Sequence, residues 1–240
     1  MEYKYQSIVL GKRDVNEVDR LYTVYTKEMG KVRLLAKGVR KSDARLAGNL
    51  ETLNLAEIFV ARSRGRGNIT GVIALENYLS LKNNLETLEK VFKTFSTFDL
   101  LVSQEEKDVE IFKLLADYLS VMEEIEKEGG HLARVEVLSV GFLFQILGRL
   151  GYGMQMKKCV SCGRRLSGGE NFFAVSRGGT ICASCAGREK RKIRMSNAAI
   201  NLVRIFLENR LENFKKIRID QKNLNNAKVV LEEAIRWIAN

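Results

Sequence analysis

The stretch KKCVSCGRRLSGGENFFAVSRGGTICASC, residues 157–185, contains all four cysteines of the chain: Cys159, Cys162, Cys182 and Cys185. They follow the spacing C-x2-C-x19-C-x2-C. Each C-x2-C pair places two sulfurs close enough to bind one ion, and the intervening segment is long enough to fold back so that the second pair completes a tetrahedron. The spacing predicts a four-cysteine knuckle with one Zn²⁺ per chain, and an iron–sulfur cluster is the alternative.

The four-thiolate set argues against an enzyme. A catalytic zinc usually has three protein ligands and keeps one position open for water, whereas four cysteines close the site. The only histidine, His131, is followed by Leu132 and Ala133, so the H-x-E pattern of zinc deaminases is missing. The GxxxxGK[ST] motif of nucleotide hydrolysis is missing too. We therefore expect a structural zinc ion and no catalytic residues.

Positive charge is concentrated in two regions of the chain, whose formal net charge is +11. Residues 156–195 contain 10 basic and 2 acidic side chains, and residues 1–80 contain 14 and 9, whereas residues 81–155 have an acidic excess. Strong local positive charge is typical of proteins that bind nucleic acid. An anionic membrane is a weaker alternative, because no basic amphipathic helix is evident, and an inert basic surface is a third.

The chain shows no signal for export or membrane insertion. Its N-terminal residues, MEYKYQSIVLGKRD, lack the basic start and the long apolar run of a signal peptide. No apolar run reaches the ~18 residues that a membrane span needs. We therefore expect a cytoplasmic protein without a membrane partner.

The first 80 residues have the alternating pattern of β-strands. Apolar and polar side chains alternate most clearly over residues 21–26 and 53–58. Five runs rich in β-forming residues cover 6–15, 20–29, 31–38, 53–62 and 69–79. Five short strands in so few residues fit a small closed barrel, for which the OB-fold is the first candidate and an SH3-like barrel the second.

Helices are predicted after residue 84, where the apolar period changes to three and four residues. They begin near residues 85 and 109 and cover 132–150 and 224–238, and Ser196 is placed to cap another. The acidic stretch 123–128 is interpreted as a solvated helix end. The predicted fold class is α+β and multidomain: an N-terminal OB-fold nucleic-acid-binding β-barrel at 1–80, an α-helical domain in two parts at 81–156 and 191–240, and the inserted zinc knuckle at 157–190.

Basic residues of the barrel and the knuckle are candidates for contact with nucleic-acid phosphates. The barrel contributes Arg33, Lys37, Arg40, Lys41, Arg45, Arg62, Arg64 and Arg66, and the knuckle contributes Lys158, Arg164, Arg165 and Arg177. Tyr22, Tyr25 and Phe59 are candidates for stacking on bases, although an inward-facing aromatic residue of a barrel more commonly belongs to the core.

Three stretches of the chain resemble the RecO recombination-mediator family of bacterial DNA repair: AKGVRK at 36–41, LGRLGY at 147–152 and CVSCG at 159–163. Their order and spacing extend the resemblance along the whole chain. One departure is Ala183, where the second pair in the family often reads C-P-x-C. Because proline supplies no ligand, this departure leaves the predicted metal site intact.

The resemblance implies a DNA repair protein without a chemical step. Members of this family bind single- and double-stranded DNA, anneal complementary strands, and work with RecR, and in some systems RecF, to load recombinase onto DNA coated by single-stranded-DNA-binding protein (SSB). They also bind the acidic, apolar C-terminal tail of SSB on the helical domain. The resemblance thus implies association with the nucleoid. The residues alone leave two alternatives open: a zinc-ribbon factor that acts on RNA or in transcription, and a zinc hydrolase.

Arg134 is the candidate residue for the partner site that the resemblance implies. It is one of two arginines between residues 81 and 155, and it opens the most apolar helix of the chain. A tail that ends in an apolar side chain and a carboxylate needs a cation and apolar walls, and Leu138, Phe142 and Phe144 lie along the same helix. The alternative is that Arg134 pairs with an acidic neighbour, Glu128 or Glu136.

Overall fold

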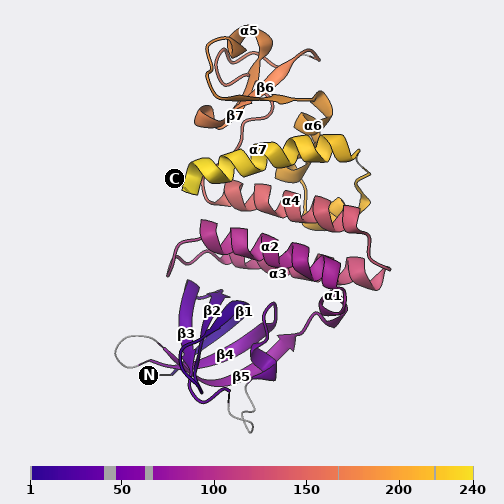
Figure 1. The fold of residues 1–240 in the computed structure, drawn as a ribbon. Helices are drawn as coiled ribbons and strands as arrows, with labels where there is room; N and C mark the ends of the chain where they lie inside the picture. The colour runs from indigo at the N-terminus through magenta and orange to yellow at the C-terminus, as the bar shows by residue number, and fades with distance from the viewer. Residues whose placement is uncertain (1, 41–46, 63–66, 167, 219, 240) are drawn as a thin grey trace. The chain divides into compact units, whose positions relative to one another are not determined.

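The computed structural model describes residues 2–40, 47–62, 67–166, 168–218 and 220–239. The chain divides into two compact units, Met1–Lys127 and Glu128–Asn240 (Figure 1). The domain boundaries expected from the sequence, at residues 80, 156 and 190, stay a prediction. No described helix has both the length and the apolar character that a membrane span requires.

The first unit begins with a closed five-stranded barrel. Its strands are β1 (Glu2–Asp14), β2 (Arg20–Thr26), β3 (Gly30–Ala36), β4 (Leu55–Ala61) and β5 (Asn68–Glu76), and a short 3-10 helix, η1 (Gly48–Leu50), precedes β4. The order around the barrel is β1-β2-β3-β5-β4, and β1 closes it by pairing with both β2 and β4 (Figure 1). β3 and β5 run parallel. This topology confirms the predicted OB-like fold.

Alternating side chains of the strands fill the barrel. Tyr22 and Val24 of β2 belong to the buried cluster inside it, together with Ile58 of β4. Tyr25 faces the other side of β2 and is only 1% exposed, because its ring packs edge-on against Phe98 at a centroid distance of 5.3 Å. The hypothesis that Tyr22 and Tyr25 stack on bases is therefore wrong: both rings are buried by the protein itself.

Helices α1 (Leu79–Asn83), α2 (Leu85–Leu101) and α3 (Val109–Lys127) complete the first unit. α1 lies where the fifth predicted strand was expected to end, because Tyr78 adopts a left-handed backbone conformation with φ 48°. The carboxylate of Glu123 on α3 accepts hydrogen bonds from the backbone N–H groups of Ser80 and Leu81 at 3.2 and 2.9 Å. The interpretation of this acidic stretch as a solvated helix end is thus wrong at Glu123, which anchors α1.

The loop between α2 and α3 is attached to the start of β3. The backbone N–H of Glu105 donates to the carbonyl oxygen of Lys31 at 2.9 Å, and Gln104 pairs with Lys31 as a parallel bridge. Gly30, with φ +67°, allows this approach, since a Cβ atom there would lie 2.6 Å from the carbonyl carbon of Glu106. The side chain of Lys31 also donates to the carbonyl oxygen of Asp99 at 2.6 Å. The barrel and these helices therefore share backbone hydrogen bonds as well as apolar packing.

The second unit is built on helices α4 (Leu132–Arg149), α6 (Asn197–Glu208) and α7 (Gln221–Ala239), with a 3-10 helix, η3 (Leu211–Lys216), before α7. Gly141 lets α4 approach the aromatic residues of the neighbouring elements. A Cβ atom at this position would lie 2.7 Å from Cδ2 of Phe214 and 2.8 Å from Cδ1 of Phe206. The predicted cap of α6 is confirmed, because the hydroxyl oxygen of Ser196 accepts a hydrogen bond from the backbone N–H of Ala199 at 3.0 Å.

The cysteine segment forms a small sheet between α4 and α6 in the sequence. β6 (Asn171–Ala174) and β7 (Gly179–Cys182) form a hairpin, and β8 (Lys192–Met195) pairs with the other edge of β6. A 3-10 helix, η2 (Val175–Arg177), connects β6 to β7, and the short helix α5 (Ala183–Ala186) follows β7. The predicted insertion of a cysteine knuckle into a helical domain is confirmed.

Candidate metal centre and anion-binding surfaces

The knuckle brings the four predicted ligands together. Each cysteine offers one Sγ atom, and these atoms all lie within 4.8 Å of one another. The sulfurs of Cys162 and Cys182 are 3.9 Å apart, and all four residues are free thiols. A tetrahedral ion with metal–sulfur bonds of about 2.3 Å has sulfur–sulfur edges of about 3.8 Å. The donor set and its spacing therefore fit one thiolate-bound metal ion.

A tight backbone turn and a close approach of two segments bring the cysteine pairs to the same point. Gly163 ends the turn with φ +72°, and its N–H donates to the carbonyl oxygen of Cys159 at 2.8 Å. Gly179 opens β7 so close to the segment before the first cysteine that a Cβ atom would lie 2.9 Å from the carbonyl oxygen of Gln155. The backbone N–H of Cys182 in turn lies 3.5 Å from the sulfur of Cys159. Hydrogen bonds of this kind favour the thiolate form, which binds the metal.

The thiols have unequal pKa values because their neighbours differ. The guanidinium of Arg164 lies 3.5 Å from the sulfur of Cys162 and, with the backbone N–H of the same arginine, lowers the pKa of Cys162 to about 6. Burial opposes ionisation of Cys159, but backbone N–H groups outweigh it and lower its pKa. A hydrogen bond with Ser161 favours the Cys185 thiolate, yet the neighbouring sulfurs and burial raise its pKa to about 11. Thiols this close ionise together only when a cation compensates their charge.

The four basic residues predicted to bind DNA from the knuckle differ in their surroundings. Arg164 contacts the sulfur of Cys162, and Arg177 pairs with Glu189 at 3.1 Å. Lys158 and Arg165 face each other across a single antiparallel bridge and are both exposed. Neither contacts an acidic side chain within the part of the chain that the structure describes. Lys158 and Arg165 are therefore the more accessible cations of the four.

The basic residues predicted to bind DNA from the barrel lie in different surroundings. Arg33 and Arg62 line one cavity of about 370 Å³, where the side chain of Arg62 pairs with Glu105 at 3.3 Å. Arg40 instead pairs with Asp14 at 3.3 Å, and Lys37 is exposed. The remaining candidates, Lys41, Arg45, Arg64 and Arg66, lie outside the described residues.

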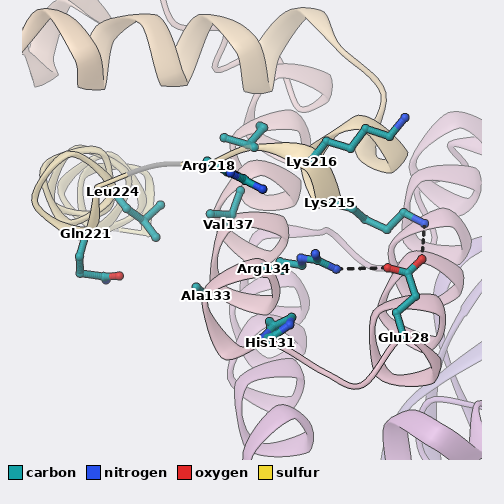
Figure 2. A pocket seen from close by; sticks show the side chains of 11 residues that line it. Glu128, His131, Ala133, Arg134, Val137, Lys215, Lys216, Arg218, Gln221 and Leu224 are labelled. Carbon is teal, nitrogen blue, oxygen red and sulfur yellow. Dashed lines mark hydrogen bonds and ion pairs between the residues drawn. The ribbon is translucent and has the colours of Figure 1, made fainter.

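A second, larger cavity of about 620 Å³ lies beside the start of α4. Four cations line it, Arg134, Lys215, Lys216 and Arg218, together with one carboxylate, that of Glu128. Figure 2 shows this carboxylate between Arg134 and Lys215, at 3.2 Å from Nη1 of Arg134 and 3.5 Å from Nζ of Lys215. The cavity therefore carries an excess of positive charge, and an internal carboxylate occupies part of it.

The apolar lining of this cavity differs from the prediction. Leu138, Phe142 and Phe144 are fully buried and do not line the cavity. The apolar lining residues are instead Ala133, Val137, Ile217 and Leu224. Of the two alternative partners expected for Arg134, Glu128 is the one observed, while Glu136 pairs with Lys228.

Two family models match this chain over both of its parts. The model described as recombination protein O N terminal matches residues 1–78, and the model described as recombination protein O C terminal matches residues 95–238. The chain belongs to the RecO family. The resemblance found in the sequence is thereby confirmed.

Curated RecO relatives are similar to the chain along nearly its whole length. The DNA repair protein RecO of Roseiflexus sp. is 28% identical over 236 residues, which cover 98% of this chain and 81% of the relative. That of Dehalococcoides mccartyi is 25% identical over 237 residues, with 99% and 90% covered. That of Desulforamulus reducens is 25% identical over 235 residues, with 98% and 89% covered. The chain is thus a DNA repair protein of the RecO family.

Sequence reasoning on this RecO chain missed the cations that share a cavity with Arg134. Lys215, Lys216 and Arg218 follow it by more than 80 residues, at the end of η3 and directly after it. Their clustering as KKIR at 215–218 was the one available signal, and it marked a basic patch without indicating its neighbours.

Proposed function

We propose that this RecO-family chain is a recombination mediator. It binds single- and double-stranded DNA, anneals complementary strands, and helps RecR, and in some systems RecF, to load recombinase onto SSB-coated DNA. The observation that carries the proposal is the match of both RecO family models to one chain whose first 80 residues include an OB-like barrel. The protein performs this work by binding, without a chemical step, in the cytoplasm and at the nucleoid.

Annealing requires two polyanionic strands to approach each other, and bound cations lower their repulsion. Contacts with phosphates rather than base edges allow strands of any sequence to be bound. Arg33 of the barrel and Lys158 and Arg165 of the knuckle are the best supported contacts because they are exposed, and Arg62 is added because it lines the same cavity as Arg33. The other DNA-binding candidates complete two basic regions, one for each strand: Lys37, Arg40, Lys41, Arg45, Arg64 and Arg66 in the barrel, and Arg164 and Arg177 in the knuckle.

We propose that Zn²⁺ is the ion of the four-cysteine centre. Zn²⁺ is commonly bound by four cysteines in tetrahedral structural sites, and the sulfur positions suit that geometry. Cys159 and Cys162 would then be tied to Cys182 at the end of β7 and to Cys185 in α5. A bound ion supplies cross-links that stabilise the small sheet, which buries only a small apolar cluster of its own.

The cavity beside α4 is the proposed site for the acidic tail of SSB. The tail carboxylate would bind Arg134 and Lys215 in place of Glu128, and its apolar side chain would contact Ala133 and Ile217, the apolar lining residues that are not buried. Two further cations, Lys216 and Arg218, line the cavity and suit the acidic residues that precede the end of the tail. Charge and apolar lining are thus combined in one cavity, as such a ligand requires.

Annealing of complementary strands coated with SSB tests the proposed function. The protein should anneal them faster than they anneal alone, and Arg33→Glu should slow the reaction. Lys90→Glu is the matched control, since it makes the same change of charge at an exposed lysine of α2, outside both basic regions of the sequence. Annealing no faster than without protein refutes the mediator proposal. Equal binding of structured RNA and DNA would instead favour a zinc-ribbon factor that acts on RNA.

A further inference from the structure

The last turns of α7 expose the only tryptophan of the chain. Trp237 is 53% exposed. Tryptophan carries a large apolar ring system and is well buried on average, so an accessible one is a candidate contact for a partner. Its ring can also stack on other flat aromatic groups, including nucleic-acid bases.

Cations from two segments meet one helical turn before Trp237. The carboxylate of Glu233 lies 3.9 Å from Nη2 of Arg191, which follows α5, and it also pairs with Arg236 of α7. Residues four positions apart lie on the same face of a helix, so Trp237 adjoins the point where Arg191 reaches α7. An exposed aromatic ring and two arginines therefore share one surface.

The same surface carries more positive than negative charge. Arg188 and Lys190 precede Arg191 and are exposed, and neither contacts an acidic side chain among the residues that the structure describes. Arg177 lies nearby, paired with Glu189, which follows Arg188. The charged residues of this region are the cations Arg177, Arg188, Lys190, Arg191, Lys192 and Arg236 and the acids Glu189, Glu232 and Glu233. The excess of cations favours an anionic partner over an apolar protein surface.

We propose that Trp237 stacks on an unpaired base of single-stranded DNA whose phosphates are bound by Arg188, Lys190 and Arg191. This inference rests on the proposed DNA-binding function and adds a specific contact to it. Exposed aromatic rings beside a basic groove are the combination by which proteins bind single strands without sequence preference. Bases inside a duplex are paired and stacked on each other, so they offer no free face to Trp237. The contact is therefore lost when two strands anneal, which favours release of the duplex product.

Fluorescence of the full-length protein tests the proposal directly, because Trp237 is the only source of tryptophan emission. Titration with oligothymidine should quench this emission, and added salt should restore it as the strand dissociates. A blunt duplex of the same length should bind without quenching. Anisotropy of labelled strands measures binding independently. Single-strand binding with unchanged emission, or equal quenching by the duplex, overturns the stacking contact while the proposed function stands. Absence of binding to either DNA overturns both.

Substitution provides the second arm of the test. Trp237→Leu should weaken single-strand binding by at least about fivefold, the lower end of what one base–aromatic stack contributes. Trp237→Phe should recover most of the loss, because the smaller ring still stacks. Phe92→Leu on α2 is the matched control, since Phe92 is also an exposed aromatic residue, at 40%, and should leave the affinity unchanged. Equal affinity of the wild type and Trp237→Leu, with both proteins folded by circular dichroism, contradicts the proposal.

Discussion

Glu128→Gln should increase the affinity of the cavity beside α4 for an acidic peptide that ends in a free carboxylate. Glu128 contacts both Arg134 and Lys215, so a ligand carboxylate reaches these cations only by displacing it (Figure 2). Glutamine has nearly the same size and removes the charge. The substitution therefore weakens an internal competitor and leaves the cations in place.

The expected increase in peptide affinity is modest because the ion pairs are accessible to water. The side chains of Glu128 and Arg134 are 51% and 38% exposed, and that of Lys215 is 18% exposed. An exposed ion pair contributes about 0–1 kcal/mol, so the two pairs together give at most about 2 kcal/mol. Solvent screening reduces this to about 1 kcal/mol, which corresponds to about fivefold tighter binding.

Anisotropy of a labelled SSB-tail peptide measures the effect, and Glu136→Gln is the matched control. Glu136 lies on α4 and loses the same charge, but it pairs with Lys228 and does not line the cavity. Only Glu128→Gln should tighten binding, whereas Arg134→Ala should weaken it by about 1.5–3 kcal/mol, the value of a hydrogen bond to a charged group. An equal increase of peptide affinity in both glutamine variants would show that the net charge of the protein alone determines the effect. Weaker peptide binding by Glu128→Gln would refute the idea that the Glu128 carboxylate competes with the ligand carboxylate.

The other predictions concern the metal, the core and the DNA contacts. Metal analysis of protein purified without chelator should find one zinc ion per chain, and zinc-free wild type would reject the metal assignment. Cys159→Ala should lose the ion and make the knuckle sensitive to protease, since structural zinc contributes folding free energy. Gly141→Ala should lower the free energy of unfolding by about 1–3 kcal/mol through overpacking against Phe214. Gly148→Ala on the same helix should raise the free energy of unfolding by about 0.4–1 kcal/mol, because a Cβ atom added there would have no other atom within 4 Å. Denaturant titration measures both changes, and equal effects of the two substitutions would contradict the packing argument. DNA affinity should fall linearly with the logarithm of salt concentration, and Arg33→Glu with Lys37→Glu should lower both affinity and slope; a salt-independent affinity would exclude phosphate contacts.

The parts of the structure that depend on local patterns were predictable from the sequence. Alternation along β2 indicated a strand, the cysteine spacing indicated a metal knuckle, and Ser196 marked the start of α6. These signals are local because strand faces, ligand pairs and helix caps each depend on residues a few positions apart. The order of these elements then led to the OB-like barrel and the inserted knuckle.

The parts that depend on distant residues were not predictable. The sequence made Tyr25 a candidate for base stacking, but it gave no indication that Phe98 would cover its ring. α1 escaped prediction because its first backbone N–H groups are satisfied by Glu123, more than 40 residues later. The cations that share a cavity with Arg134 are equally remote in sequence. A charged residue gives no sequence signal of the partner it will find.

The loop that hydrogen-bonds to β3 limits how the barrel can be transferred to another protein. Among the residues that the structure describes, β3 and β5 share one registered pair, Leu35 with Asn68. At Lys31, near the start of β3, the strand's backbone is instead paired with Gln104 and Glu105. A fragment that ends with β5 would leave the backbone groups of Lys31 open to pairing with another chain. We therefore do not expect the barrel alone, cut after β5, to be a well-behaved separate domain. Duplication, fusion or domain exchange should preserve it only when the segment through α3 travels with it.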